Sequence, residues 1–189
     1  MKSAVLGGSF NPVHNAHIRL ARAVRDIGYE RIIFVPAADP PHKRLSDGAT
    51  DRQRIEMLSL AIEGLDWAML WEGEIHRHGK SYTIDTIREL KESGLVEGLP
   101  GLIIGDDLAA GFAGWKDAEA LARETTIILA KRGAADVDFP FSCVRLENGI
   151  WPDSSTEARS RVSSGKDLGD LVPVEVARYI ARNGLYGRD

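Results

Sequence analysis

The sequence has one cysteine in 189 residues, which leaves no disulfide framework and no zinc site built from cysteines. It also has no apolar run that approaches the ~20 residues needed to span a bilayer. The apolar start of the chain, residues 1–6, meets two glycines before it can form the core of a signal peptide. From these absences we expect a soluble, cytoplasmic protein.

Positive charge is also in short supply. The 24 Lys and Arg residues are outnumbered by 28 Asp and Glu residues, which gives a net charge of −4. Proteins that coat nucleic acid or anionic membranes are usually basic, so we expect neither partner. Hydrophobic residues (43%) and charged residues (28%) are in the proportions of a globular protein, which excludes disorder as the main state. We expect residues 1–189 to form one domain, whereas the sequence leaves homo-oligomer formation open.

Short apolar runs alternate with amphipathic segments along the chain. Strands are expected at residues 4–6, 31–35, 67–71, 101–105, 126–130 and 143–146. Helices are expected after Pro12, from Thr50 to about Leu65, at 83–92, at 117–123, from Ser154 and from Pro173. This alternation predicts an α/β fold: a Rossmann-like, doubly wound parallel sheet with helices on both faces and a helical C-terminal end.

The densest group of candidate functional residues follows the first strand, at residues 7–17. Glycines there permit a tight turn with exposed N–H groups, and the next helix adds positive charge at its start, which together make an anion site. His14 and His17 lie on one side of the first helical turn, where two imidazoles can donate hydrogen bonds to a polyphosphate. A metal pair is an alternative that lacks a clear third ligand, and an ordinary turn with two hydrogen-bonded histidines is another.

A second candidate lies near the other end of the chain, at residues 153–159. Ser155 and Thr156 bring hydroxyl groups to a helix start and Arg159 follows one turn later, which favours a second phosphate site. Ser154 and Glu157 also match an ordinary capping box, so a purely structural role is the alternative.

Three isolated residues are further candidates. Asp107 follows Gly105 at the end of a buried strand, where it can accept hydrogen bonds from a ribose or serve as a turn residue. Trp115 can stack on a ligand ring or pack in the core. Lys43 lies in a long loop, residues 37–49, where it reaches either phosphate or solvent. A P-loop is excluded, because no glycine stands five residues before Gly79, and a G-x-G-x-x-G fingerprint is absent after the first strand.

Taken together, these segments resemble a known family. Gly-Gly-Ser-Phe-Asn-Pro-Val-His-Asn-Ala-His at residues 7–17 is similar to the G-G-[ST]-F-D-P-x-H-x-G-H signature of the nucleotidyltransferase superfamily. The segments at residues 40–43, 81–86, 103–107, 154–159 and 172–186 look like those of bacterial nicotinate-nucleotide adenylyltransferases, in the same order along nearly the whole chain.

This resemblance implies transfer of AMP from ATP to nicotinate mononucleotide in NAD biosynthesis, with Mg²⁺ carried on the ATP. By the same resemblance, His14, His17 and Arg159 are the catalytic residues, and Thr83 and Trp115 bind the nicotinate. The residues expected to bind ATP are Gly8, Ser9, Phe10, Lys43, Gly105, Asp107, Ser155 and Thr156.

The chain departs from the family pattern at several positions. Asn11 replaces an Asp, which is expected to remove a charge beside the phosphates, and Ala16 replaces a Gly between the two histidines. Lys116 stands where an aromatic residue or His is common. A sister enzyme acting on nicotinamide mononucleotide or pantetheine phosphate, and a non-catalytic nucleotide-binding protein of the same fold, are the alternative interpretations.

Overall fold

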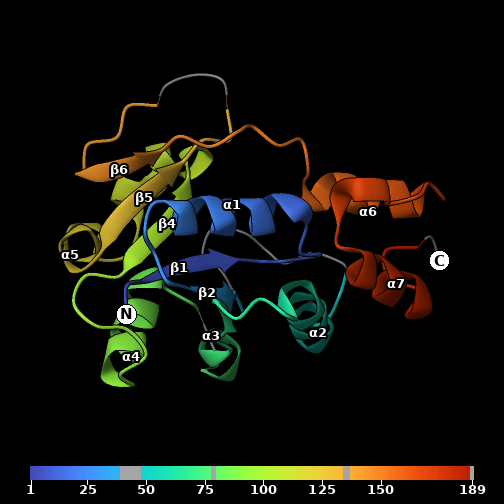
Figure 1. The fold of residues 1–189 in the computed structure, drawn as a ribbon, viewed down its shortest axis with the longest axis horizontal. Helices are drawn as coiled ribbons and strands as arrows, with labels where there is room; N and C mark the ends of the chain where they lie inside the picture. Colours follow the sequence, from blue (N-terminus) through green and yellow to red (C-terminus); the bar gives the residue numbers. More distant parts are fainter. Residues whose placement is uncertain (39–47, 78–79, 134–136, 188–189) are drawn as a thin grey trace.

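Six strands form one parallel sheet in the order β3-β2-β1-β4-β5-β6 (Figure 1). The computed structural model describes residues 1–38, 48–77, 80–133 and 137–187. The strands are β1 (Ser3–Gly8), β2 (Arg31–Pro36), β3 (Ala68–Leu70), β4 (Gly101–Gly105), β5 (Thr126–Ala130) and β6 (Cys143–Leu146). This strand order is that of the doubly wound α/β folds, so the predicted fold class is confirmed.

The helices also follow the predicted order. They are α1 (Asn15–Asp26), α2 (Asp51–Ile62), α3 (Gly73–His76), α4 (Thr83–Glu92), α5 (Ala118–Glu124), α6 (Ser155–Ser163) and α7 (Val174–Arg182), with 3₁₀ helices η1 (Asp106–Gly114) and η2 (Gly169–Leu171). The capping box of Thr50 and Gln53 opens α2 as predicted, but the helix ends at Ile62, short of Leu65. Sequence reasoning missed α3 and η1.

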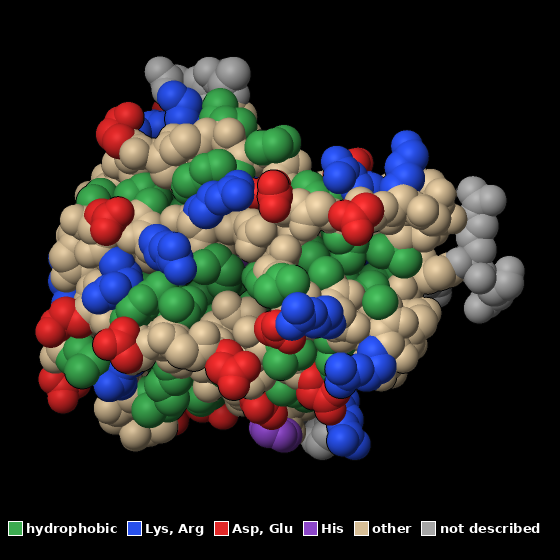
Figure 2. Space-filling model, turned by 45° about the vertical axis from the view of Figure 1, so that its right-hand side comes forward, with side chains coloured by type: hydrophobic (Ala, Val, Ile, Leu, Met, Phe, Trp, Pro, Cys, Tyr) green, Lys and Arg blue, Asp and Glu red, His purple; other side chains and the backbone are tan. Residues whose placement is uncertain are grey.

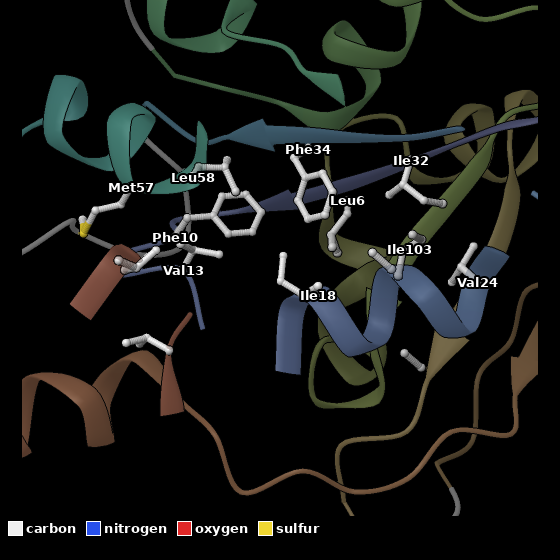
Figure 3. Close-up of a cluster of buried hydrophobic side chains, with 14 of the residues drawn as sticks. Leu6, Phe10, Val13, Ile18, Val24, Ile32, Phe34, Met57, Leu58 and Ile103 are labelled. Carbon is white, nitrogen blue, oxygen red and sulfur yellow. The ribbon is translucent and has the colours of Figure 1, made fainter. Parts of the chain in front are cut away.

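Both faces of the sheet are buried. Leu6, Phe34 and Ile103 pack against α1 on one face, where Figure 3 shows them near Ile18 and Val24. The residues that alternate with them along the strands, such as Val5 of β1, face α4, α5 and η1 on the opposite side. Burial on both faces is the reason that the central strands are continuous apolar runs.

The site is positioned by the point at which the strand order reverses. From β1 the chain crosses to β2 on one side, whereas β4 lies against β1 on the other. In open α/β sheets a crevice forms outside the carboxyl ends of the strands at such a point. Helices α6 and α7 lie beyond the carboxyl end of β1 (Figure 1), so the C-terminal part of the chain reaches this crevice.

The surface carries both signs of charge. On the face shown in Figure 2, acidic and basic side chains are intermixed, in keeping with the small net charge of −4. Within the described residues, no helix is both long and apolar enough to cross a membrane.

Candidate active site

A cleft of about 540 Å³ opens at the carboxyl ends of β1 and β4. Its walls come from the β1–α1 turn, the start of α4, η1 and the start of α6. The lining residues include Gly7, Gly8, Ser9, His14, His17, Glu74, Ser81, Tyr82, Thr83, Gly105, Asp107, Trp115, Lys116, Trp151, Ser155 and Thr156. Segments from the two ends of the sequence therefore face one space.

The turn after β1 forms the floor of the cleft. At position 8 this turn has little room for any residue larger than glycine. A Cβ atom at Gly8 would lie 3.1 Å from the ring of Phe10, closer than side chains ordinarily pack. Phe10 is fully buried and has a positive φ of 44°, which is unusual for a large side chain. The Phe10 ring packs in the core, against Phe34 and the edge of His17. This packing fixes the backbone of the turn beneath the cleft.

Arg54 holds the same turn from behind. Its guanidinium is 1% exposed and donates hydrogen bonds to the carbonyl oxygens of Ser9 (2.6 Å) and Ala37 (2.7 Å). It also pairs with Asp51 at 2.8 Å. Sequence reasoning missed Arg54, because arginine is rarely buried and this one belongs to no motif.

His14 and His17 stack against each other at the start of α1. Their ring centroids are 3.6 Å apart, and the backbone N–H of His14 donates to Nδ1 of His17 at 3.1 Å. Because Nδ1 of His17 accepts this hydrogen bond, a neutral His17 carries its proton on Nε2. Nδ1 of His14 is buried and has no hydrogen-bond partner among the described residues. The pair therefore has ring nitrogens that remain available to hydrogen-bond a ligand.

Both imidazoles are neutral near pH 7. Burial, with a smaller contribution from the Arg132 cation, lowers the pKa of His14 to about 3. Burial, the neighbouring His14 and Arg132 together hold the pKa of His17 well below its ordinary value. Neutral rings of this kind act as hydrogen-bond donors rather than as fixed cations.

Helix α6 joins the β1–α1 turn directly. Ser155 donates its hydroxyl hydrogen to the carbonyl oxygen of Pro12 at 2.8 Å, and Arg159 donates to the carbonyl oxygen of Asn11 at 2.7 Å. An ion pair of 2.6 Å links Arg19 of α1 to the buried Asp153 that precedes α6. The two segments that sequence analysis singled out at opposite ends of the chain are thus in contact.

The side chain of Asn11 turns away from the cleft. It is 6% exposed and accepts hydrogen bonds from the Tyr186 hydroxyl (2.7 Å) and the Ala49 N–H (3.3 Å). Burial raises the pKa of the Tyr186 hydroxyl, which therefore stays protonated as the donor. The expectation that Asn11 removes a charge beside the phosphates does not match this geometry, because its side chain is not part of the cleft wall.

The end of β4 forms another wall. Asp106 is buried and accepts hydrogen bonds from the backbone N–H groups of Arg132 (2.9 Å) and Gly133 (3.3 Å), so its role is structural. Asp107 lines the cleft and pairs with the Arg132 guanidinium at 3.3 Å. A Cβ atom on Gly105 would lie 2.2 Å from the Asp107 carboxylate, so a larger residue there would displace this half-exposed side chain.

Thr83 and Trp115 also line the cleft. Thr83 is the first residue of α4, and no side chain caps this helix start. Trp115 is half-buried and its ring lies 5.1 Å from that of Phe112, between centroids. An aromatic face and a helix N-terminus thus border the same space.

The comparisons with known proteins agree with one another. A profile of cytidylyltransferase-like proteins matches residues 5–164. A protein of Borrelia garinii subsp. bavariensis is 35% identical over 98% of this chain and 95% of its own length, and one of Listeria monocytogenes serotype 4b is 34% identical over 99% and 98%. Both are named "Probable nicotinate-nucleotide adenylyltransferase". The chain belongs to the nicotinate-nucleotide adenylyltransferase family.

A solved structure of the same family shares the fold. The nicotinic acid mononucleotide adenylyltransferase of Plasmodium falciparum, complexed with NaAD, superposes with a TM-score of 0.80. Its sequence is 22% identical, and the match covers 98% of each chain. At that identity the likeness supports the architecture of this adenylyltransferase family member and not its individual contacts.

The structure of this adenylyltransferase brings most of the predicted site residues to one cleft. Those that line it are Gly8, Ser9, His14, His17, Thr83, Gly105, Asp107, Trp115, Ser155 and Thr156. Phe10 lies in the core beneath the cleft, and Arg159 contacts the β1–α1 turn instead of the cleft wall. Lys43 lies outside the described residues.

Sequence reasoning also missed residues that line the cleft of this adenylyltransferase. Trp151 stands just before the second motif, and its position next to residues 153–156 was the available signal. Glu74 is buried and accepts a 2.6 Å hydrogen bond from Thr86, while burial raises the pKa of its carboxyl group. Among the described residues, no three His, Cys, Asp or Glu side chains gather as a group that would hold a metal ion.

Proposed function

We propose that this chain transfers AMP from ATP to nicotinate mononucleotide, releasing pyrophosphate and giving nicotinate adenine dinucleotide. The names of relatives 34–36% identical over nearly the whole chain support this reaction. The location of the cleft, at the switch point of a doubly wound sheet, suits a nucleotide. We further propose that residues 1–189 act as one nucleotidyltransferase domain in the cytoplasm, since the reaction consumes ATP.

The stacked histidine pair is the observation that carries the proposal. In it, Nε2 of neutral His17 carries a proton that it can donate to a non-bridging oxygen of the α-phosphate, and His14 offers a second ring to the same phosphates. Hydrogen bonds placed in advance where negative charge builds up lower the barrier of phosphoryl transfer. A neutral imidazole keeps one N–H group, so each ring can donate a hydrogen bond to a phosphate oxygen without carrying a charge.

The remaining site residues divide between the two substrates. For ATP we propose the backbone of Gly8, Ser9 and Phe10, the side chains of Ser155, Thr156, Arg159 and Lys43 at the β- and γ-phosphates, and Gly105 with Asp107 at the ribose. For the nicotinate ring we propose Thr83 and a stacking contact with Trp115, since both residues line the cleft.

The reaction needs no covalent intermediate on the chain. A phosphate oxygen of nicotinate mononucleotide attacks the α-phosphorus of ATP, and the bond from that phosphorus to the bridging oxygen breaks as pyrophosphate leaves. The chain positions the two reactants and stabilises the charge. We propose that Mg²⁺ enters with ATP as part of the substrate and keeps most of its water ligands.

A pyrophosphate-release assay tests this function. Purified protein receives ATP and Mg²⁺ together with nicotinate mononucleotide, nicotinamide mononucleotide or phosphopantetheine in separate reactions. We expect release with nicotinate mononucleotide to exceed release with the other two acceptors. Pyrophosphate release with another acceptor would change the assignment of the substrate. ATP binding without any pyrophosphate release would favour a non-catalytic nucleotide-binding protein.

A further inference from the structure

Two short segments form the part of the cleft wall that we propose for the pyridine ring. Tyr82 and Thr83 come from the start of α4, and Trp115 and Lys116 follow η1; all four line the cleft. Lys116 is therefore part of the wall against which the proposed nicotinate ring lies.

The ammonium group of Lys116 has a defined position. It donates to both carboxylate oxygens of Asp85, at 3.0 and 2.8 Å, and lies 4.7 Å from the centre of the Tyr82 ring. Its side chain is 43% exposed, so it remains within reach of a ligand in the cleft. The ion pair and the aromatic ring keep the charge beside the start of α4.

The charges around this wall would otherwise work against an anionic ligand. Glu74 lines the cleft, and Asp85 occupies the first turn of α4, where it offsets the partial positive charge of an uncapped helix start. Lys116 neutralises Asp85, which leaves the helix N-terminus available to a negative group. Without Lys116, Asp85 would remain unneutralised at this helix start, close to a wall that already contains Glu74.

We propose that the Lys116 side chain determines the preference of this site for the acid over the amide, by favouring the nicotinate carboxylate over the uncharged nicotinamide. This inference rests on the proposed function. Discrimination between a charged and an uncharged ligand of the same shape falls to charges close to that group, and Lys116 is a cation that the cleft wall places there.

The test compares kinetic constants for the two mononucleotides in Lys116→Met and Lys116→Arg. We expect Lys116→Met to lower kcat/KM for nicotinate mononucleotide about two- to fivefold, the size expected for a partly exposed charge interaction, and to leave kcat/KM for nicotinamide mononucleotide unchanged. Lys116→Arg keeps the charge and should keep the preference. Adding salt should weaken the preference of the wild type more than that of Lys116→Met.

Two further variants make the test specific. Lys91 lies on α4 and also contacts an acid, Glu124, but does not line the cleft, so Lys91→Met should leave both constants unchanged. Asp85→Asn removes the partner of Lys116 and should strengthen the preference for the acid.

Each outcome separates this inference from the proposed function. Equal losses of kcat/KM for both mononucleotides in Lys116→Met would assign Lys116 a structural role and overturn the inference. Unchanged kcat/KM values for both mononucleotides would overturn it as well. A wild type that releases no pyrophosphate with nicotinate mononucleotide would instead overturn the proposed function, and the inference with it.

Discussion

At the residue scale, the protonation and tautomers of His14 and His17 determine which hydrogen bonds the cleft can offer a ligand. Their rings are in contact and largely shielded from water, so a positive charge on either ring is costly. The hydrogen bond from the His14 N–H to Nδ1 of His17 also selects the tautomer of the second ring. The pair is therefore a set of neutral donors with fixed orientation.

Replacing His17 by alanine tests its role in the reaction. We expect His17→Ala to lower kcat about 10²- to 10³-fold, the usual effect of losing one preorganised donor to a developing oxyanion. Circular dichroism and thermal unfolding should show a folded protein, and pyrophosphate release measures the rate. His76→Ala is the matched control, because His76 is exposed and lies outside the cleft wall. An unchanged rate in His17→Ala would refute the role assigned to this ring.

The lowered histidine pKa also predicts how stability depends on pH. The pKa of His14 is about 3 in the folded chain and near 6.5 when unfolded, so acid protonates the unfolded chain first. Stability from this group is complete above about pH 6.5 and is lost as the pH falls towards 3. At pH 5 the loss amounts to about 2 kcal/mol for His14, and His17 acts in the same direction.

Urea unfolding at pH 7.5 and pH 5 measures this loss. In His14→Gln the same drop in pH should cost less stability than in the wild type, because one of the two titrating rings is absent. Equal pH dependence in the two proteins would show that His14 titrates normally in the folded state.

At the scale of elements, one side chain of α2 stabilises the turn after β1. Arg54→Met would leave the carbonyl oxygens of Ser9 and Ala37 without their buried donor. We expect the free energy of unfolding to fall by about 2–4 kcal/mol, as for other losses of a buried charged hydrogen-bond partner. Because Ser9 belongs to the proposed phosphate site, KM for ATP should also rise.

Arg52→Met provides the comparison on the same helix. Arg52 is exposed and contacts only Glu56 among the hydrogen bonds and ion pairs of the described residues. Its loss should leave both the free energy of unfolding and KM for ATP unchanged within error. If both variants behaved alike, Arg54 would have no special part in holding the turn.

Elements with strong patterns were predictable from the sequence, and those without were not. The limits of β4, β5, β6 and α4 match the prediction, because apolar runs and helical periodicity mark them clearly. Helix α3 has four residues and η1 contains Gly111, so neither produces a periodic signal. The burial of Arg54 depends on backbone carbonyls distant in sequence, and no local pattern reports them.

At the scale of the whole molecule, the motifs named the segments of the site but not the direction of each side chain. The sequence predicted two candidate phosphate sites at residues 7–17 and 153–159, and hydrogen bonds from Ser155 and Arg159 show that these two segments are in contact. Sequence could not show that Asn11 faces Tyr186, because that depends on how the C-terminal segment packs. Motif matching thus locates the segments that form a cleft better than it predicts the direction of their side chains.

The C-terminal segment also contacts the turn after β1. Tyr186 donates its hydroxyl hydrogen to Asn11, whose own carbonyl oxygen accepts from Arg159. Tyr186→Phe removes one buried hydrogen bond, so the free energy of unfolding should fall by about 1 kcal/mol. Because the turn and Arg159 both depend on Asn11, KM for ATP should rise as well.

Tyr179→Phe separates this coupling from a general loss of stability. Tyr179 also lies in the C-terminal part of the chain, but its hydroxyl donates to Glu56 of α2 and not to a residue of the turn. We therefore expect Tyr179→Phe to lower stability in urea unfolding while leaving KM for ATP at the wild-type value. A rise in KM for ATP in both variants would mean that the ATP site responds to stability alone. A rise confined to Tyr186→Phe would mean that the end of the chain holds the turn after β1 in place through Asn11.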